Sequence, residues 1–148
     1  AVYYDGTALQ RVLEHVNLND LDADACGTYA EDAFSFLRRV PQPRPYDFVI
    51  LDPPAFAKRS DDIDDAKKAY TDLNRLALDM LPKGGLLLTC SCSYQMTPEL
   101  FQTAVFHAAM QAEKPVRIIS RHRQAADHPV NLYHPETDYL KSLLLWVG

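Results

Sequence analysis

The fold is decided by the stretch Tyr46-Asp47-Phe48-Val49-Ile50-Leu51-Asp52-Pro53-Pro54-Ala55-Phe56. Residues 48–51 form a continuous apolar run, which predicts a short strand buried on both faces of a parallel sheet. The run stops at an acid and two prolines, and an aromatic residue follows. Because ligands bind beyond the carboxyl ends of the strands in open α/β sheets, the stretch predicts a binding site at the end of this strand.

Short apolar stretches alternate with longer stretches of helical period on both sides of this strand. The alternation is typical of an α/β fold with a mostly parallel sheet. Strands are expected at residues 2–4, 25–29, 86–89, 116–120 and 143–147, and helices at residues 7–18, 31–39, 69–80 and 98–111. The prolines of residues 41–45 predict an extended loop. We expect residues 1–148 to form a single domain.

The composition indicates a cytoplasmic protein without a membrane span. The chain has 148 residues, enough for one compact core. Its longest apolar run, residues 143–147, is far shorter than the ~20 residues of a membrane helix. The three cysteines are an odd number and suit a reducing compartment. The net charge of −5 disfavours a free-standing nucleic-acid binder. The acidic run at residues 61–65 is expected to be a solvated loop.

Two cysteines lie at the end of the strand expected next along the chain. Cys90 and Cys92 are predicted to share a sheet edge with Asp52. A nucleophilic cysteine needs thiolate character and access to its substrate. The alternative is that both thiols are buried small apolar groups. Their spacing is too close for the usual zinc pair, so no metal site is expected. Cys26 is expected to be structural, at the start of a core strand.

Acidic residues follow three of the expected strands. Asp5 and Asp32 stand where an acid commonly accepts the ribose hydroxyls of a nucleoside cofactor, and helix capping is the alternative for both. Asp52 is followed by Pro53 and Pro54, which fix the backbone, and a turn capped by the acid is the alternative. Phe56 offers a face for a planar base, a contact worth ~1–3 kcal/mol.

At these residues the chain resembles the ribosomal RNA large-subunit methyltransferase I family, a group of cytosine-C5 methyltransferases of class I fold. The resemblance covers nearly the whole chain. Its most specific parts are Asp52-Pro53-Pro54-Ala55-Phe56, Tyr70-Thr71-Asp72-Leu73-Asn74, Ser91-Cys92-Ser93, Gln124-Ala125-Ala126-Asp127-His128-Pro129 and Pro135-Glu136-Thr137-Asp138-Tyr139-Leu140-Lys141. It implies a Rossmann-like sheet with an antiparallel last strand, S-adenosylmethionine as cofactor and 23S ribosomal RNA as partner.

The resemblance also assigns roles to single residues. It implies that Asp5 binds the ribose of the cofactor and that Asp32 lies on its adenine side. Asp52 is the motif acid, beside the cofactor, that meets the target base, with Pro53, Pro54 and Phe56 as substrate contacts. Cys92 rather than Cys90 occupies the nucleophile position, because in this group the cysteine lies seven residues beyond the second glycine of the Gly84-Gly85 turn.

The chain departs from the group in two respects. Many of these enzymes carry a second cysteine three residues after the motif acid, a position that Ala55 fills here. The chain also has five glycines but no Gly-x-Gly, so the first strand and its glycine-rich cofactor loop are expected to be missing. We therefore expect a C-terminal part of the catalytic domain that binds cofactor weakly or not at all by itself, and whose exposed strand edges favour self-association into a homo-oligomer.

Three functions stay open at the level of sequence. The first is an RNA cytosine-C5 methyltransferase that uses Cys92 and Asp52. The second is a methyltransferase of exocyclic amines on nucleic acid, in which Asp52 and the following prolines hold an amino group and no cysteine is needed. The third is a methyltransferase-like module without catalytic activity, which the missing Gly-x-Gly favours.

Overall fold

The computed structural model describes residues 1–3, 5–40 and 46–148. It divides into two compact units, Ala1–Pro41 and Gln42–Gly148, which are described one at a time below. The expectation of a single domain stays a prediction. The loop predicted from its prolines at 41–45 lies outside the described residues.

The first unit holds a small parallel sheet and two helices. Its elements are β1 (Val2–Tyr3), α1 (Gly6–Leu18), β2 (Tyr29–Ala30) and α2 (Ala33–Arg39). The strands pair in parallel, with Val2 opposite Tyr29. The prediction of a strand over 25–29 is wrong in extent, because the Cys26 N–H donates to the Ala23 carbonyl at 3.1 Å and so forms a turn. Cys26 is therefore half-buried in a loop rather than part of a core strand.

The second unit is built on a four-stranded sheet of β3 (Phe48–Leu51), β4 (Leu86–Ser91), β5 (Val116–Arg123) and β6 (Lys141–Val147). Their order across the sheet is β3-β4-β6-β5. β3 and β4 are parallel, and β6 runs antiparallel to both of its neighbours. Three strands therefore share one direction and the last strand along the chain opposes them. This confirms the predicted α/β sheet with an antiparallel last strand.

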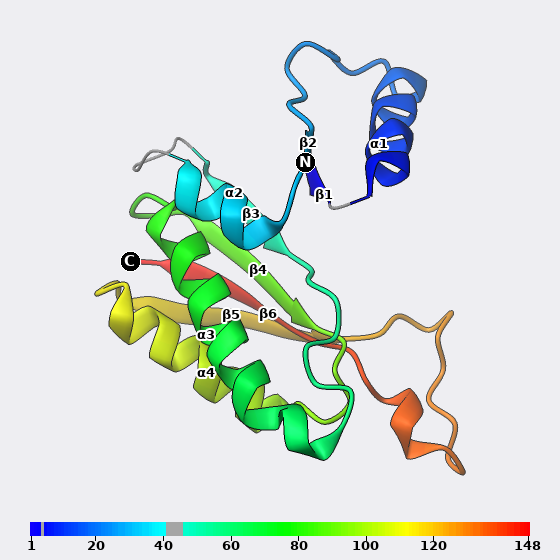
Figure 1. Cartoon of the computed structure of the whole chain (residues 1–148), viewed down its shortest axis with the longest axis vertical. Helices are drawn as coiled ribbons and strands as arrows, with labels where there is room; N and C mark the ends of the chain where they lie inside the picture. Colours follow the sequence, from blue (N-terminus) through cyan, green and yellow to red (C-terminus); the bar gives the residue numbers. More distant parts are fainter. Residues whose placement is uncertain (4, 41–45) are drawn as a thin grey trace. The chain divides into compact units, whose positions relative to one another are not determined.

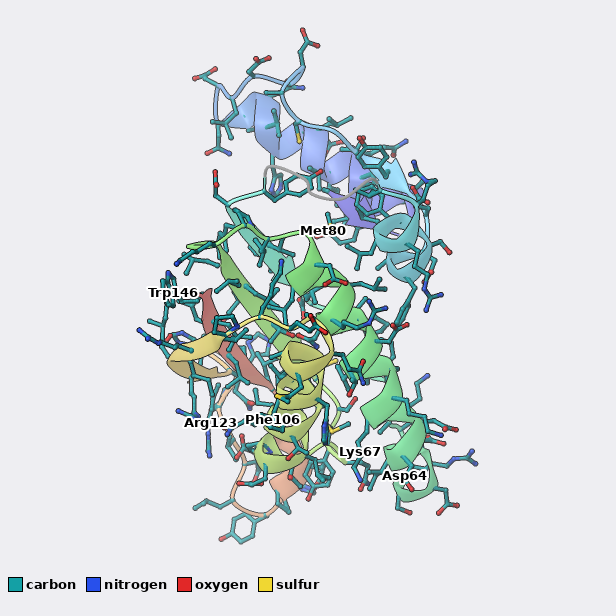
Figure 2. The ribbon with its side chains drawn as sticks, turned by 90° about the vertical axis from the view of Figure 1, so that its left-hand side faces the viewer. Asp64, Lys67, Met80, Phe106, Arg123 and Trp146 are labelled. Carbon is teal, nitrogen blue, oxygen red and sulfur yellow. The ribbon has the colours of Figure 1, made fainter. Side chains whose placement is uncertain are left out.

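The helices α3 (Ile63–Asp79) and α4 (Pro98–Gln111) pack side by side over one face of this sheet (Figure 1). The acidic run is not a loop, because α3 begins within it. Asp64 lies in the first turn, where carboxylates complement the helix dipole, and its Oδ1 is 3.1 Å from Lys67 Nζ. Figure 2 shows this pair near the beginning of α3 and Met80 at its other end.

The two faces of the sheet differ in burial. Leu87 and Leu145 are fully buried beneath the helices, whereas Phe48 is 49% exposed and Ile50 61% exposed. β3 is an edge strand of its sheet, and α3 and α4 cover only one of its faces. The prediction that this strand is buried on both faces is therefore wrong for the unit. Among the described residues, every helix is too short or too polar to span a bilayer.

Two turns fix where the strands and helices of this unit begin. Gly84 has φ of 88°, a left-handed conformation that favours glycine, and its N–H donates to the Val147 carbonyl at 2.7 Å. A side chain at Gly85 would meet the Pro82 carbonyl at 3.0 Å. Thr97 caps α4 as predicted, because its Oγ1 accepts the Leu100 N–H at 3.3 Å.

Candidate active site

The structure brings the predicted acid and the predicted nucleophile to one rim of the sheet. Asp52 directly follows β3, and Cys92 directly follows β4, its parallel neighbour. The Cys92 thiol donates to the Pro53 carbonyl across 3.8 Å, within the range of a sulfur hydrogen bond. Cys92 is half-buried and Asp52 is exposed, so both side chains are open to a ligand. The backbone of the Asp-Pro-Pro segment is therefore in contact with the thiol, while the Asp52 carboxylate itself interacts with Cys90.

Cys90 differs from Cys92 in its electrostatics. Burial, and next the nearby Asp52 carboxylate, raise the pKa of the Cys90 thiol to about 11. At neutral pH this thiol stays protonated, so it is a poor nucleophile and has no capacity to accept a proton. Its position in β4 is thus that of a structural thiol.

A buried hydrogen-bond network connects the acid segment (residues 52–57) with the cysteine turn (residues 91–93). The hydroxyl of Ser93, the residue after Cys92, accepts the Ala57 N–H at 3.3 Å. It also lies 3.1 Å from the Tyr70 hydroxyl, which α3 supplies. Tyr70 and Ser93 are buried, and burial raises the pKa of the tyrosine hydroxyl. The positions of the two loops are therefore coupled through Ser93 and Tyr70.

Phe56 takes part in the same cluster. Its ring centroid lies 4.8 Å from that of Tyr70, and Tyr70 in turn meets the edge of Phe101 at 5.3 Å. Phe56 and Pro53 are half-buried, whereas Pro54 is exposed. Part of the Phe56 ring is therefore packed in the protein core. A role of its exposed part in substrate binding stays a prediction.

Lys141, at the start of β6, is a site residue to which the sequence assigned no role. It is only 9% exposed, and its ammonium donates to the carbonyls of Ser93 and Tyr139, the latter at 2.9 Å. Burial lowers the pKa of Lys141 to about 8, and Cys92 and Asp138 act against that shift. A lysine that precedes an apolar strand usually lies in water, so only the fold reveals this burial.

A pocket of about 350 Å³ opens beside the cysteine turn. Its walls come from the segment after Cys92, the end of β5 and the start of β6, and they comprise Tyr94, Gln95, Met96, Thr97, Pro98, Arg123, Asp138, Leu140 and Lys141. Arg123 Nη1 lies 3.2 Å from Asp138 Oδ2. The pocket lies at the same end of the strands as Cys92 and offers both apolar and polar contacts.

The acids of the first unit lie at strand ends, as predicted, and both cap helices. Asp5 accepts the Thr7 N–H at 2.8 Å, and Asp32 accepts the Ser35 N–H at 2.9 Å. Each bond uses one carboxylate oxygen, and both side chains are exposed. A pocket of about 340 Å³ adjoins Asp5. Exposed carboxylates beyond two parallel neighbouring strands suit the hydroxyls of a nucleoside, so this donor set fits the predicted cofactor.

Nearly the whole chain is similar in sequence to part of a group of ribosomal RNA methyltransferases. Ribosomal RNA large subunit methyltransferase I from Shewanella frigidimarina is 39% identical over 138 residues, 93% of this chain and 35% of that protein. The protein of the same name from Cronobacter sakazakii is 42% identical over 135 residues, 90% of this chain and 34% of that protein. The chain is homologous to part of ribosomal RNA large subunit methyltransferase I. It spans about a third of the length of these methyltransferases. No family model matches it.

Solved structures agree on the fold. A structure described as a methyltransferase complexed with SAH superposes with a TM-score of 0.79 at 23% identity, covering 97% of this chain and 37% of that one. A second, described as an S-adenosylmethionine-dependent methyltransferase from Streptococcus mutans, gives a TM-score of 0.79 at 22% identity with the same coverage. The chain thus has the fold of part of a methyltransferase.

Proposed function

We propose that this chain carries the base-binding and nucleophilic groups of an S-adenosylmethionine-dependent methyltransferase that acts on cytosine C5 of 23S ribosomal RNA. The observation that supports the proposal most directly is the Cys92 thiol 3.8 Å from the Pro53 carbonyl, beside Asp52. The homologues named ribosomal RNA large subunit methyltransferase I supply the substrate class.

The chemistry requires these two side chains. Cytosine C5 is a weak nucleophile. When the Cys92 thiolate forms a bond to C6, C5 becomes an enamine carbon that accepts a methyl cation. Asp52 hydrogen-bonds the N3 and N4 edge of the base and stabilises the charge that develops in the adduct. Water or another basic group then takes the proton from C5, the electron pair of that C–H bond restores the double bond between C5 and C6, and the bond between C6 and sulfur breaks to regenerate the thiolate.

The proposal assigns cofactor binding to two acids of the first unit. Asp5 and Asp32 would hold S-adenosylmethionine through its nucleoside, as their exposed carboxylates at the ends of β1 and β2 allow. When bound, S-adenosylmethionine supplies an electrophilic methyl group. The cytoplasmic location and the homo-oligomer expected from the sequence stay predictions.

The test is to replace Cys92 with alanine in the protein that carries this chain and to follow methyl transfer to ribosomal RNA, with the product nucleoside identified by mass spectrometry. The proposal expects 5-methylcytidine from the parent protein and a loss of activity of at least about 10³-fold in the variant. RNA that contains 5-fluorocytidine should trap a covalent adduct with the parent protein, because fluorine at C5 cannot leave as a proton does.

Methylation of an exocyclic amine is the second candidate, and the exposed Asp52 followed by two prolines favours it. In that reaction the amine nitrogen attacks the methyl group directly and no thiol bond forms. Cys92→Ala would then retain activity, the product would carry the methyl group on N4, and no adduct would form with the fluorinated RNA. The two candidates therefore give opposite results in the same assays.

A further inference from the structure

The buried amine of Lys141 lies next to the proposed nucleophile, and the mechanism above does not use it. Lys141 pairs with Ser91 across β4 and β6, so it stands one residue from Cys92 at the end of the sheet. Its Nζ donates to the carbonyl of Ser93, on the other side of Cys92. The lysine thus contacts the turn that carries the thiol and restricts its movement.

The charges around Cys92 also indicate that Lys141 acts on its thiol. Among the described residues whose pKa is shifted, Tyr70 on α3, Cys90 on β4 and Lys141 on β6 each interact electrostatically with the Cys92 thiol. Of these three, only Lys141 carries a positive charge, and an adjacent cation favours a thiolate. The Asp138 carboxylate also interacts with Lys141 and so competes with Cys92 for its charge, whereas the Asp52 carboxylate acts on Cys90.

We propose that Lys141 is a positioning residue for Cys92, which fixes the cysteine turn through the Ser93 carbonyl and supplies the positive charge that stabilises the Cys92 thiolate. The thiol proton passes to solvent, and Lys141 stays protonated. The catalytic meaning of this arrangement rests on the function proposed above. The effect on the thiol itself does not, since it needs neither RNA nor cofactor.

The test measures the reactivity of the thiol directly. Cys26→Ala and Cys90→Ala leave Cys92 as the only thiol, and its alkylation by iodoacetamide is followed by mass spectrometry from pH 6 to pH 10. Lys141→Gln keeps a donor for the Ser93 carbonyl but has no charge. We expect it to slow alkylation at pH 7 by about tenfold and to move the inflection of the profile upward. Lys141→Arg should stay within about twofold of the parent protein.

The pKa of Lys141 also predicts how the ratio of alkylation rates in the parent protein and in Lys141→Gln depends on pH. Because the pKa of Lys141 is about 8, the ratio of parent to Lys141→Gln rates should be largest below pH 8 and approach one above it. A purely structural role would change the plateau rate at high pH, which reports access, and would leave the inflection in place. Identical inflections in the two proteins would overturn the proposal.

A matched control is available in Lys114, which also donates to backbone carbonyls, those of Leu78 and Leu81. It precedes the start of β5, at the end of the sheet opposite to Lys141. Lys114→Gln should leave the inflection unchanged. If Lys141→Gln does not fold by circular dichroism, Lys141→Met and Lys141→Arg give the same contrast of charge. If Cys92→Ala proves active on RNA while Lys141→Gln still moves the inflection, the proposed function fails and the role of Lys141 stands.

Discussion

Removal of the Ser93 hydroxyl should uncouple the cysteine turn from the acid segment. In Ser93→Ala the buried Ala57 N–H and the Tyr70 hydroxyl both lose the oxygen that lies 3.3 Å and 3.1 Å from them, respectively. A buried donor without a partner costs about 1–3 kcal/mol. Tyr70 also has Ser91 and the Phe56 backbone within reach, which lessens its loss. We therefore expect the free energy of unfolding to fall by about 2 kcal/mol.

Tyr70→Phe removes the other end of the same contact and should cost about 1 kcal/mol, because Ser93 still accepts the Ala57 N–H. The double variant should be no less stable than Ser93→Ala alone, since no tyrosine hydroxyl is left without its partner. The expected coupling energy is therefore about 1 kcal/mol. The measurement is urea unfolding at pH 7, followed by the fluorescence of Trp146, the single tryptophan of the chain.

The control for this cycle is Thr103→Ala, which removes an exposed hydroxyl that donates to the Glu99 carbonyl at 2.8 Å within α4. It should change stability by less than about 0.5 kcal/mol. Additive effects of Ser93→Ala and Tyr70→Phe, with a coupling energy below about 0.3 kcal/mol, would refute the reasoning, because independent sites add within that error.

Three further changes have expected outcomes. Thr89→Val should raise the free energy of unfolding by up to about 1 kcal/mol in a urea titration, because the buried Thr89 Oγ1 has no hydrogen-bond partner among the described residues. Lys114→Met should lower the thermal midpoint, because its Nζ donates to the carbonyl of Leu78, in the last turn of α3, at 2.6 Å and to that of Leu81, beyond the helix, at 2.7 Å. Charged hydrogen bonds of this kind contribute about 1.5–3 kcal/mol, so an unchanged midpoint would contradict this. The raised pKa of Cys90, about 11, means that the folded state binds more protons than the unfolded state between about pH 9 and pH 11. Cys90 therefore contributes stability that is lost through that window, by up to about 3 kcal/mol, whereas the lowered pKa of Lys141, about 8, adds stability as the pH rises in the same range. The measurement is the difference between the parent protein and Cys90→Ala in urea titrations at successive pH values, in which the parent should lose stability relative to the variant between about pH 9 and pH 11.

The sequence predicted the elements whose local signals are strong. The strand at Phe48–Leu51 and the helix from Pro98 to Gln111 have the predicted bounds, because an apolar run and a threonine cap act within a few residues. The start of α3 was misplaced because aspartates suit both a loop and the first turn of a helix. Burial of residues 48–51 was overestimated because it depends on what covers the sheet, which periodicity does not encode.

The site was predictable in part for the same reason. Asp52 and Cys92 follow parallel neighbouring strands, so their shared rim follows from the α/β pattern alone. The roles of Ser93 and Lys141 depend on contacts between segments that are far apart in the chain. Lys141 reaches the Ser93 carbonyl only because β6 inserts antiparallel beside β4, and no local pattern indicates that pairing.

The polar residues where β4 ends and β6 begins are costly to bury. Ser91, Ser93 and Lys141 are all less than a tenth exposed, in a region where apolar residues of similar size would cost less to bury. Thr89 and Ser142 are also buried in this sheet, but Lys141 is the one charged residue among the buried residues described, and it pairs with Ser91, next to Cys92. Ser93 is stabilised by its own hydrogen bonds, so Lys141 is the buried polar residue whose position is best explained by its effect on Cys92. The alkylation profile of Cys92 is therefore the measurement that tests the role of Lys141, and the activity of Cys92→Ala on RNA is the one that tests the proposed function.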